Sequence, residues 1–478
     1  MGLAPFTSFP CLLSLALLAA GGVSGGEPQR ITVDFSVALG EVRALHGINR
    51  GPLSPNGLFN VTDAQKRLRV PSSRLHDCQH PNPNVVDVHT IFPNPDADPA
   101  LPASYDFRAT DEYIAAVRAT GAEVIYRLGE SIEHQTVKRF VHPPRDPVRW
   151  AAVCAGIVRH YNEGWAGGFH YGIRYWEIWN EPENRPVMWT GSDAQFLDLY
   201  RATARLLRAE FRQIKIGGPG FGYCGKFDGQ ELQPSELCVA LLDLCRRESL
   251  PMDFFSWHCY TDSPVELAAR ARAVRRLLDA RGFTKTESHL NEWNLLPGNS
   301  WDILSREAAP ETRQRGVDQM MGAPGGAFLV AALIELQDAP LDMGNFYHGD
   351  FGIFGMFTEV GAPTRNYYAM LAFGQMLDTT KRVRATGAAP GKQFVLAGTN
   401  AQKTQAAVLV SNLSGGEAMR LDLKQLPWQG ATAVEVCLVD SQHAFEPLAL
   451  RTLAVSELPL NLRAPAVALV TLRPQEKP

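Results

Sequence analysis

The 478-residue sequence has few cysteines, little net charge and no internal repeat, and each absence excludes a class of protein. Eight cysteines at irregular spacing, with no CxxC pair, match neither a disulfide-rich fold nor a zinc site. A formal net charge of −4 gives no electrostatic reason to bind nucleic acid or an anionic membrane. The sequence predicts a globular protein without a nucleic-acid partner, and it implies no metal or organic cofactor.

Long hydrophobic runs are also missing, apart from one at the N-terminus. Residues Phe9–Ala20 read FPCLLSLALLAA, and the small residues Gly21–Gly26 follow, as in a signal peptide and its cleavage site. The alternative is a membrane anchor, but the run is too short to span about 30 Å of hydrocarbon. We expect residues 1–25 to be a signal peptide and the mature protein to be secreted or periplasmic, without stable membrane insertion.

Removal of this segment takes Cys11 with it and leaves seven cysteines. Because seven is an odd number, at least one remains a free thiol or pairs between chains. Cys224 and Cys238 are close enough in sequence to clip one loop, although the sequence favours free thiols there.

What is present is an alternation of strand-like and helical segments from about residue 44 to 351. Ser192 and Gln195 have the spacing of a capping box, and Ser263-Pro264-Val265-Glu266 offers a cap, a first-turn proline and a returning glutamate. Eight strand–helix units indicate an α/β fold, a TIM (β/α)8 barrel over residues 36–375. The strand candidates are Ala44–Arg50, Val70–Asp77, Glu123–Gly129, Ile173–Asn180, Ile214–Gly218, Met252–Tyr260, Ser288–Asn294 and Gly344–Asp350.

Helical periodicity largely ends after residue 375. Short runs such as Gln393–Ala397 and Gln405–Ser411, separated by turn-rich segments, predict a C-terminal all-β sandwich domain over residues 376–478. The strand-like segment 30–35 precedes the first barrel strand and is placed to join the β-sheet of the C-terminal domain.

Two glutamates close predicted strands of the barrel. In Trp176–Glu183, WEIWNEPE, Glu181 lies where Pro182 ends the strand, and alternation puts it on the side opposite Asn180. In SHLNEWN, Glu292 likewise closes a strand. By strand count they end the fourth and seventh strands, and the C-terminal ends of barrel strands face one mouth.

Two carboxylates that face one cleft are the minimum equipment for cleaving a glycosidic bond. At a separation of about 5 Å, one attacks the anomeric carbon while the other protonates the leaving oxygen, so the stereochemistry is retained. Like-charge proximity is expected to raise the pKa of one partner and to keep the acid protonated near neutral pH. A single glutamate at a strand end is usually a solvated surface residue, but two of them, each among Trp and Asn, favour catalysis.

The WEIWNEPE segment, together with MWTGSDAQFLDLYRATARLLRA and IKIGGPG within residues 188–220, resembles glycoside hydrolase family 39, which includes β-xylosidases and α-L-iduronidases. The likeness runs from about Tyr105 to Tyr368. It implies a retaining, double-displacement hydrolase of oligosaccharides or polysaccharides, β-xylosidase-like, with Glu181 as the acid/base and Glu292 as the nucleophile.

The resemblance also implies substrate-binding residues. Asn180 would contact the hydroxyl beside the anomeric carbon. SSRLHDC resembles the Arg-x-His pattern of the family, in which Arg74 would keep the nucleophile ionised and His76 would bind a sugar hydroxyl. SWHCYTD offers His258 and Tyr260 on one side of a strand, and Tyr260 would orient the nucleophile. The structural alternatives are a rim ion pair for the arginine and core packing for the others.

The sugar stays open, because the Asn-Glu-Trp-Asn form around Glu292 departs from the family and resembles α-L-arabinofuranosidase barrels. The alternatives are therefore an α-L-arabinofuranosidase, an α-L-iduronidase or an endo-acting polysaccharide hydrolase. An iduronidase needs cations for the uronate, and spacing assigns none. A rival from another class is a non-catalytic carbohydrate-binding barrel, which would keep the aromatic residues but would not need both glutamates.

Overall fold

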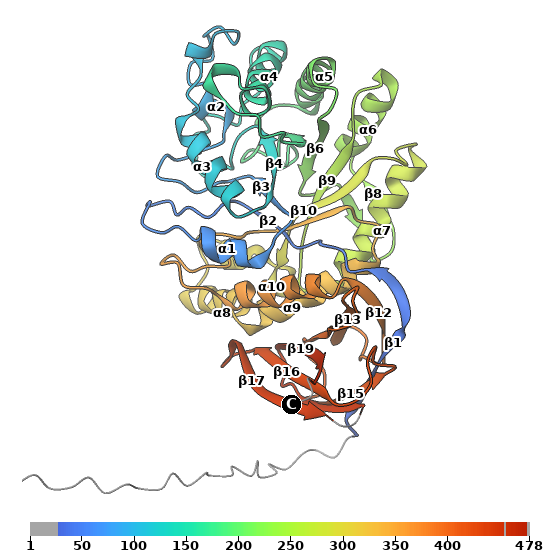
Figure 1. Ribbon diagram of the computed structural model, residues 1–478. Coiled ribbons are helices and arrows are strands. Elements are labelled where there is room, and N and C mark those ends of the chain that lie inside the picture. Colours follow the sequence, from blue (N-terminus) through green and yellow to red (C-terminus); the bar gives the residue numbers. More distant parts are fainter. Residues whose placement is uncertain (1–26, 454–455, 476–478) are drawn as a thin grey trace, which may run out of the picture.

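The computed structural model describes residues 27–453 and 456–475, so the predicted signal peptide lies outside the described residues. A helix-wrapped barrel forms one part of the chain, and a curled β-sheet lies against one side of it (Figure 1). The predicted fold class, a TIM barrel with a C-terminal β domain, is thereby confirmed.

The barrel closes through eight strands in the order β10-β11-β2-β3-β4-β5-β6-β9, and neighbouring strands pair in parallel. Each of the eight predicted strands overlaps one of them. Their bounds are β2 Gly47–Asn49, β3 Ser72–Leu75, β4 Glu123–Leu128, β5 Tyr175–Ile178, β6 Lys215–Phe221, β9 Phe254–Thr261, β10 Glu287–Leu295 and β11 Met343–Phe346.

Helices connect these strands and cover the outside of the barrel (Figure 1). A short hairpin of β7 (Gly225–Phe227) and β8 (Leu232–Pro234) follows β6. The helices are α1 Thr62–Leu68, α2 Val88–Ile91, α3 Arg108–Ala119, α4 Pro147–Glu163, α5 Asp193–Glu210, α6 Glu236–Glu248, α7 Pro264–Ala280, α8 Pro310–Met321, α9 Ala323–Glu335 and α10 Arg365–Gln375.

The sequence predicted capping bonds at the starts of two helices, and the structure has them at α5 but not at α7. The capping box of α5 is present, with the Ser192 side chain and the Gln195 side chain each accepting from the other's backbone N–H. Helix α7 begins at Pro264 as expected, but the Ser263 side chain makes no capping bond. The Glu266 backbone N–H donates instead to the Ser263 carbonyl at 3.1 Å, and the Ser263 backbone N–H donates to the Thr261 hydroxyl at 3.2 Å, so neither bond of the capping box forms.

The C-terminal strands form one continuous sheet of nine strands, which curls around its own apolar core. The N-terminal strand β1 (Gln29–Glu41) belongs to it and pairs with β12 and β15, as the sequence suggested. The other strands are β12 Lys381–Thr386, β13 Gln393–Thr399, β14 Ala406–Asn412, β15 Ala418–Lys424, β16 Thr432–Val439, β17 Ala444–Leu453, β18 Glu457–Asn461 and β19 Ala466–Pro474.

Helix α9 joins the two parts of the fold. Its sequence is apolar on all sides, and it packs against α7, α8 and α10 as well as against β13, β14 and β19. By length and apolar content, no single helix of the described chain would cross a membrane, although α8 and α9, bent by 44°, pass that test together. The burial of α9 accounts for this composition, since it is a core helix.

Strand β14 shows how the sheet serves two cores at once. Alternation along the strand sends Val408 and Val410 into the core of the β domain, whereas Leu409 between them packs in the cluster that contains the barrel and α9. All three side chains are fully buried. The β domain therefore shares apolar packing with the barrel.

All seven cysteines of the described residues are buried free thiols, which agrees with the preference stated for Cys224 and Cys238. Burial in apolar surroundings raises the pKa of the Cys224 thiol to about 12, so little thiolate forms at neutral pH.

Truncation of Leu409 tests the shared core. We expect Leu409→Ala to lower the free energy of unfolding by about 2–5 kcal/mol, because it removes fully buried methyl groups and leaves a cavity. The matched control Leu39→Ala removes a side chain that is 49% exposed on β1 and should stay within about 0.5 kcal/mol of the wild type. Urea unfolding followed by circular dichroism measures both. Equal values for the two variants would contradict a packed junction.

Candidate active site

Glu181 and Glu292 meet at the mouth of the barrel, although they lie far apart in the sequence. One carboxylate oxygen of each, together with a ring nitrogen of His258, lie within 4.8 Å of one another. His258 Nδ1 is 2.7 Å from Glu181 Oε1 and 3.5 Å from Glu292 Oε2. The imidazole therefore stands between the two acids.

The backbone after β5 turns sharply and thereby points Glu181 into the site. The strand ends at Ile178, and Trp179 and Glu181 both have positive φ, 71° and 44°. As a result Asn180 and Glu181 both line the same cavity. The expectation that they lie on opposite sides is wrong, because strand alternation stops before it reaches them.

Glycine at position 222 is what leaves room for the Glu181 carboxylate. A Cβ atom added to Gly222 would lie 2.4 Å from Glu181 Oε1, which is closer than non-bonded atoms approach. The β6 end therefore approaches the acid with bare backbone. The Gly-rich segment Gly217–Gly222, which forms most of β6 and its end, was visible in the sequence, but its partner was not.

Arg74 is completely buried and contacts three of the functional side chains from below. Its guanidinium donates to Glu292 Oε1 at 2.8 Å, to Asn180 Oδ1 at 2.6 Å and to Glu177 Oε2 at 2.6 Å. The contact with Glu292 is the one that the sequence comparison implied. The cation lies where it favours the ionised form of that carboxylate.

Glu177 is the residue that sequence reasoning missed. It is fully buried in β5 and accepts hydrogen bonds from Arg74, from the Ser256 hydroxyl and from the Asn291 amide, the last two at 2.6 Å. A charged residue at an inward position of an otherwise buried strand was the available signal, because such a group needs a buried partner.

Tyr260 and His76 complete the surroundings of Glu292. The Tyr260 hydroxyl donates to Glu292 Oε2 at 2.7 Å. His76 Nε2 lies 3.8 Å from Glu292 Oε1, and burial, followed by the nearby charge of Arg127, holds the pKa of His76 well below its usual range. His76 is therefore a neutral imidazole, suited to a hydroxyl group rather than to an anion.

The two glutamates differ in their electrostatic environment. Burial raises the pKa of Glu292 more than the charges of His258 and Arg74 lower it, so the pKa lies above the ordinary value. Burial also acts on Glu181, but the hydrogen bond and charge of His258 outweigh it, and the pKa of Glu181 lies below its ordinary value. From the sequence we expect the acid to have the raised pKa, but His258 reverses that order.

These residues surround a cavity of about 990 Å³, which is large enough for a small glycoside. Asn180, Glu181, Glu292, His76 and Tyr260 line it, whereas Arg74 and His258 lie beneath. The structure thus brings all seven predicted site residues to one place.

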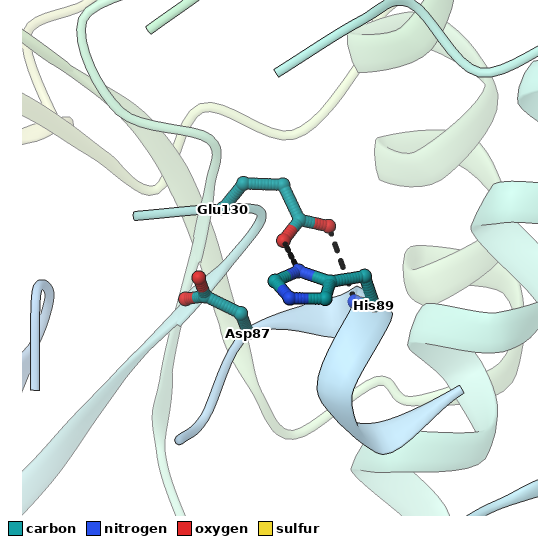
Figure 2. A group of neighbouring side chains, drawn as sticks. All are labelled: Asp87, His89 and Glu130. Atoms are coloured by element: carbon teal, nitrogen blue, oxygen red, sulfur yellow. Dashed lines mark hydrogen bonds and ion pairs between the residues drawn. The ribbon is translucent and has the colours of Figure 1, made fainter. Parts of the chain in front are cut away.

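A second polar cluster consists of Asp87, His89 and Glu130 (Figure 2). Glu130 accepts from both the ring and the backbone N–H of His89, as the dashed lines show, and burial raises the pKa of Glu130 to about 7. Asp87 accepts from Arg127 at 2.6 Å and from the backbone of Ser131, which lines the cavity. Because its groups already bond directly to one another or to a cation, the cluster supports the wall rather than forming an open ligand set.

Comparison with known proteins places these residues in context. The family described as "Glycosyl hydrolases family 39" matches residues 87–295, which include both glutamates. A β-xylosidase from Geobacillus stearothermophilus is 26% identical over 266 residues, and one from Caldicellulosiruptor saccharolyticus is 25% identical over 274 residues. Each match covers 50% of this chain, and the chain spans about half of each relative, 48% and 47%.

Solved structures resemble the whole described fold. A glucosidase from Croceicoccus marinus is 25% identical with a TM-score of 0.78 over 94% of this chain and 100% of that one. A monomeric β-xylosidase from Caulobacter crescentus, at 15% identity, has a TM-score of 0.68 over 94% and 100% of the two chains, and shares the fold. With the sequence match spanning both glutamates and the fold shared over nearly its full length, this chain is similar to glycosyl hydrolase family 39.

Proposed function

We propose that this protein is a retaining glycoside hydrolase that cleaves an O-glycosidic bond by double displacement. The observation that carries the proposal is the approach of the Glu181 and Glu292 carboxylate oxygens to within 4.8 Å. Retaining enzymes hold their carboxyl groups about 5–5.5 Å apart, whereas inverting enzymes need roughly 6.5–9.5 Å to admit a water.

In the first step Glu292 attacks the anomeric carbon, and the bond from that carbon to the leaving oxygen breaks. Glu181 gives its proton to that oxygen, so the alcohol departs neutral and a glycosyl ester forms on Glu292. In the second step Glu181 takes a proton from a water molecule, which attacks the same carbon and frees Glu292. Asn180 faces the cavity beside Glu181, where it is placed to bind the neighbouring sugar hydroxyl.

The proton for the first step is held by Glu181 and His258 together. Burial lowers the pKa of His258, but the charge of Glu292 and the hydrogen bond to Glu181 outweigh it and raise the pKa above the ordinary value. The pair thus holds one proton to higher pH than a free imidazole would, and that proton lies on a hydrogen bond of 2.7 Å that ends on Glu181. As the leaving oxygen gains negative charge, the proton moves to it through Glu181.

A neutral sugar fits the cavity better than a uronic acid. Among the described residues that line the cavity, Arg50 is the only arginine or lysine. Its guanidinium already donates to the Tyr347 hydroxyl at 2.6 Å and lies 3.6 Å from Asp350. A uronate would also meet the carboxylate of Asp77 in the same wall. Together with the two curated β-xylosidase relatives, this favours a β-xylosidase-like activity over an iduronidase.

Export belongs to the same proposal, since residues 1–25 would carry the enzyme to an extracellular or periplasmic carbohydrate.

Covalent trapping separates the hydrolase from a carbohydrate-binding barrel. We expect 2-deoxy-2-fluoro-β-xylosyl fluoride to inactivate the enzyme and to leave a fluoro-xylosyl ester on the peptide that contains Glu292, because the fluorine slows hydrolysis of the ester. Mass spectrometry of the digested protein measures this, and Glu292→Gln should show no adduct. If neither this reagent nor its glucosyl analogue labels the wild type, the binding barrel is favoured.

Loss of the acid should depend on the leaving group. Glu181→Ala is expected to lower kcat/KM by roughly 10²–10⁴-fold for a methyl or sugar leaving group, which needs a proton. The loss should be far smaller for 2,4-dinitrophenyl glycosides, because that leaving group departs as an anion. Steady-state rates on the two substrate types decide the matter, and equal losses on both would argue against the acid role.

The pH profile follows from the two shifted groups. Since Glu292 must be ionised, kcat/KM should fall as the pH drops through a pKa above 4.5. Since the Glu181–His258 pair must hold its proton, kcat/KM should fall again as the pH rises through a pKa above 6.5. Initial rates between pH 3 and 10 measure both limbs.

Tyr260→Phe removes a hydrogen bond that lowers the pKa of Glu292, so the acidic limb should move to higher pH by roughly one unit. Tyr171→Phe, which alters a tyrosine outside the cavity lining, should leave the profile in place. A shift of the acidic limb to lower pH in Tyr260→Phe would contradict this account.

A further inference from the structure

Large exposed apolar side chains gather at the opening of the catalytic cavity. Tyr223 is 55% exposed, Trp301 is 50% exposed and Leu304 is 48% exposed, and all three line this cavity. Two half-buried aliphatic side chains, Ile132 and Val187, line it as well. A group of exposed apolar side chains around a polar cavity marks a surface that a ligand covers.

Tyr223 lies on the side from which the leaving group departs. It directly follows Gly222, whose backbone lies against the Glu181 carboxylate. The Tyr223 backbone N–H also donates to Glu183 Oε1 at 2.7 Å, which fixes this segment two residues from the acid. Because Glu181 protonates the leaving oxygen, the group attached to that oxygen has to pass beside Tyr223.

Trp301 reaches the opening from a different loop. It begins the short 3-10 helix Trp301–Leu304 after β10, and its ring meets the ring of Tyr260 edge-on at 5.1 Å between centroids. Tyr260 in turn bonds to Glu292. Strands β6 and β10 flank β9 on either side in the barrel, so the Tyr223 and Trp301 loops stand on either side of the strand that carries His258 and Tyr260.

From this arrangement we propose that the opening is a subsite for a planar aryl aglycone, and that the natural substrates are glycosides of aromatic alcohols. The inference rests on the proposed hydrolase function and adds the class of leaving group. A flat apolar ring gains contact area from Tyr223, Trp301 and Leu304 without needing hydrogen bonds. Leu304, Ile132 and Val187 offer no side-chain partner to the hydroxyls of a second sugar. The polar lining residue Asn184 already donates to Glu181 at 2.9 Å, which leaves His134 as an exposed polar contact.

Binding of glycosides that cannot be hydrolysed tests this independently of turnover. We would titrate the wild type by calorimetry with three 1-thio-β-xylosides, whose aglycones are methyl, 2-naphthyl and a second xylose, and with the same series on glucose. The naphthyl compound should bind at least about tenfold more tightly than the methyl compound, and more tightly than the thio-disaccharide. A disaccharide that gains as much as the naphthyl compound would overturn the proposal in favour of a sugar subsite, and no naphthyl gain would overturn it outright.

Variants show which side chains make the naphthyl compound bind more tightly than the methyl compound. Trp301→Ala and Leu304→Ala should each remove much of the naphthyl preference while the methyl compound binds within about twofold of the wild type. Leu101→Ala, which removes a side chain that is 54% exposed and lies outside the cavity lining, should change neither. A naphthyl preference that survives in Trp301→Ala, Tyr223→Ala and Leu304→Ala would overturn the assignment. Glycosyl fluoride trapping carries no aryl group, so labelled Glu292 without an aryl preference would reject this inference alone.

Discussion

The rest of the site depends on one buried cation, the guanidinium of Arg74. It lies between the carboxylates of Glu177 and Glu292 at 2.6 and 2.8 Å, with no solvent exposure of its own. Removing such a charge from water costs several kcal/mol, and only close opposite charges with satisfied hydrogen bonds offset that cost. The same side chain bonds to Asn180, so one residue on β3 fixes groups on β5 and β10. In the proposed mechanism, this rigid arrangement would hold Glu292 in position as the nucleophile before the substrate arrives.

The barrel and the meeting of the two glutamates at one mouth could be predicted from the sequence, because both depend on local patterns. Parallel strands leave apolar runs between helices, and a strand that ends in Asn-Glu-Pro has a visible boundary. What failed depended on three-dimensional partners. The side on which Asn180 lies is set by the positive φ of Trp179, and the Ser263 side chain makes no cap because the Glu266 N–H donates to the Ser263 carbonyl instead. Glu177 escaped notice because its role is defined only by Arg74, Ser256 and Asn291 together, which three different strands supply.

The position of His258 shows why proximity of like charges does not by itself decide which carboxylate is protonated. Two acids alone would share the repulsion, and one pKa would rise. An imidazole bonded to Glu181 at 2.7 Å favours ionisation of that acid, while burial favours the neutral form of Glu292. The number of protons that the site holds therefore depends on Glu181, His258 and Glu292 together. The spacing of residues in the sequence cannot show which of them is protonated.

The cavity has two chemical environments, and under the proposed function they would receive the two halves of a glycoside. Its floor is charged and hydrogen-bonded, with Asn180, His76 and the two glutamates, so it suits a ring that carries several hydroxyls. Its rim has tyrosine, tryptophan and leucine side chains held by the loops after β6 and β10. Loops tolerate sequence change far better than barrel strands do. Under the proposed function, selection acting on those loops would change the leaving group, while Arg74 and its partners would keep the chemistry at the anomeric carbon unchanged.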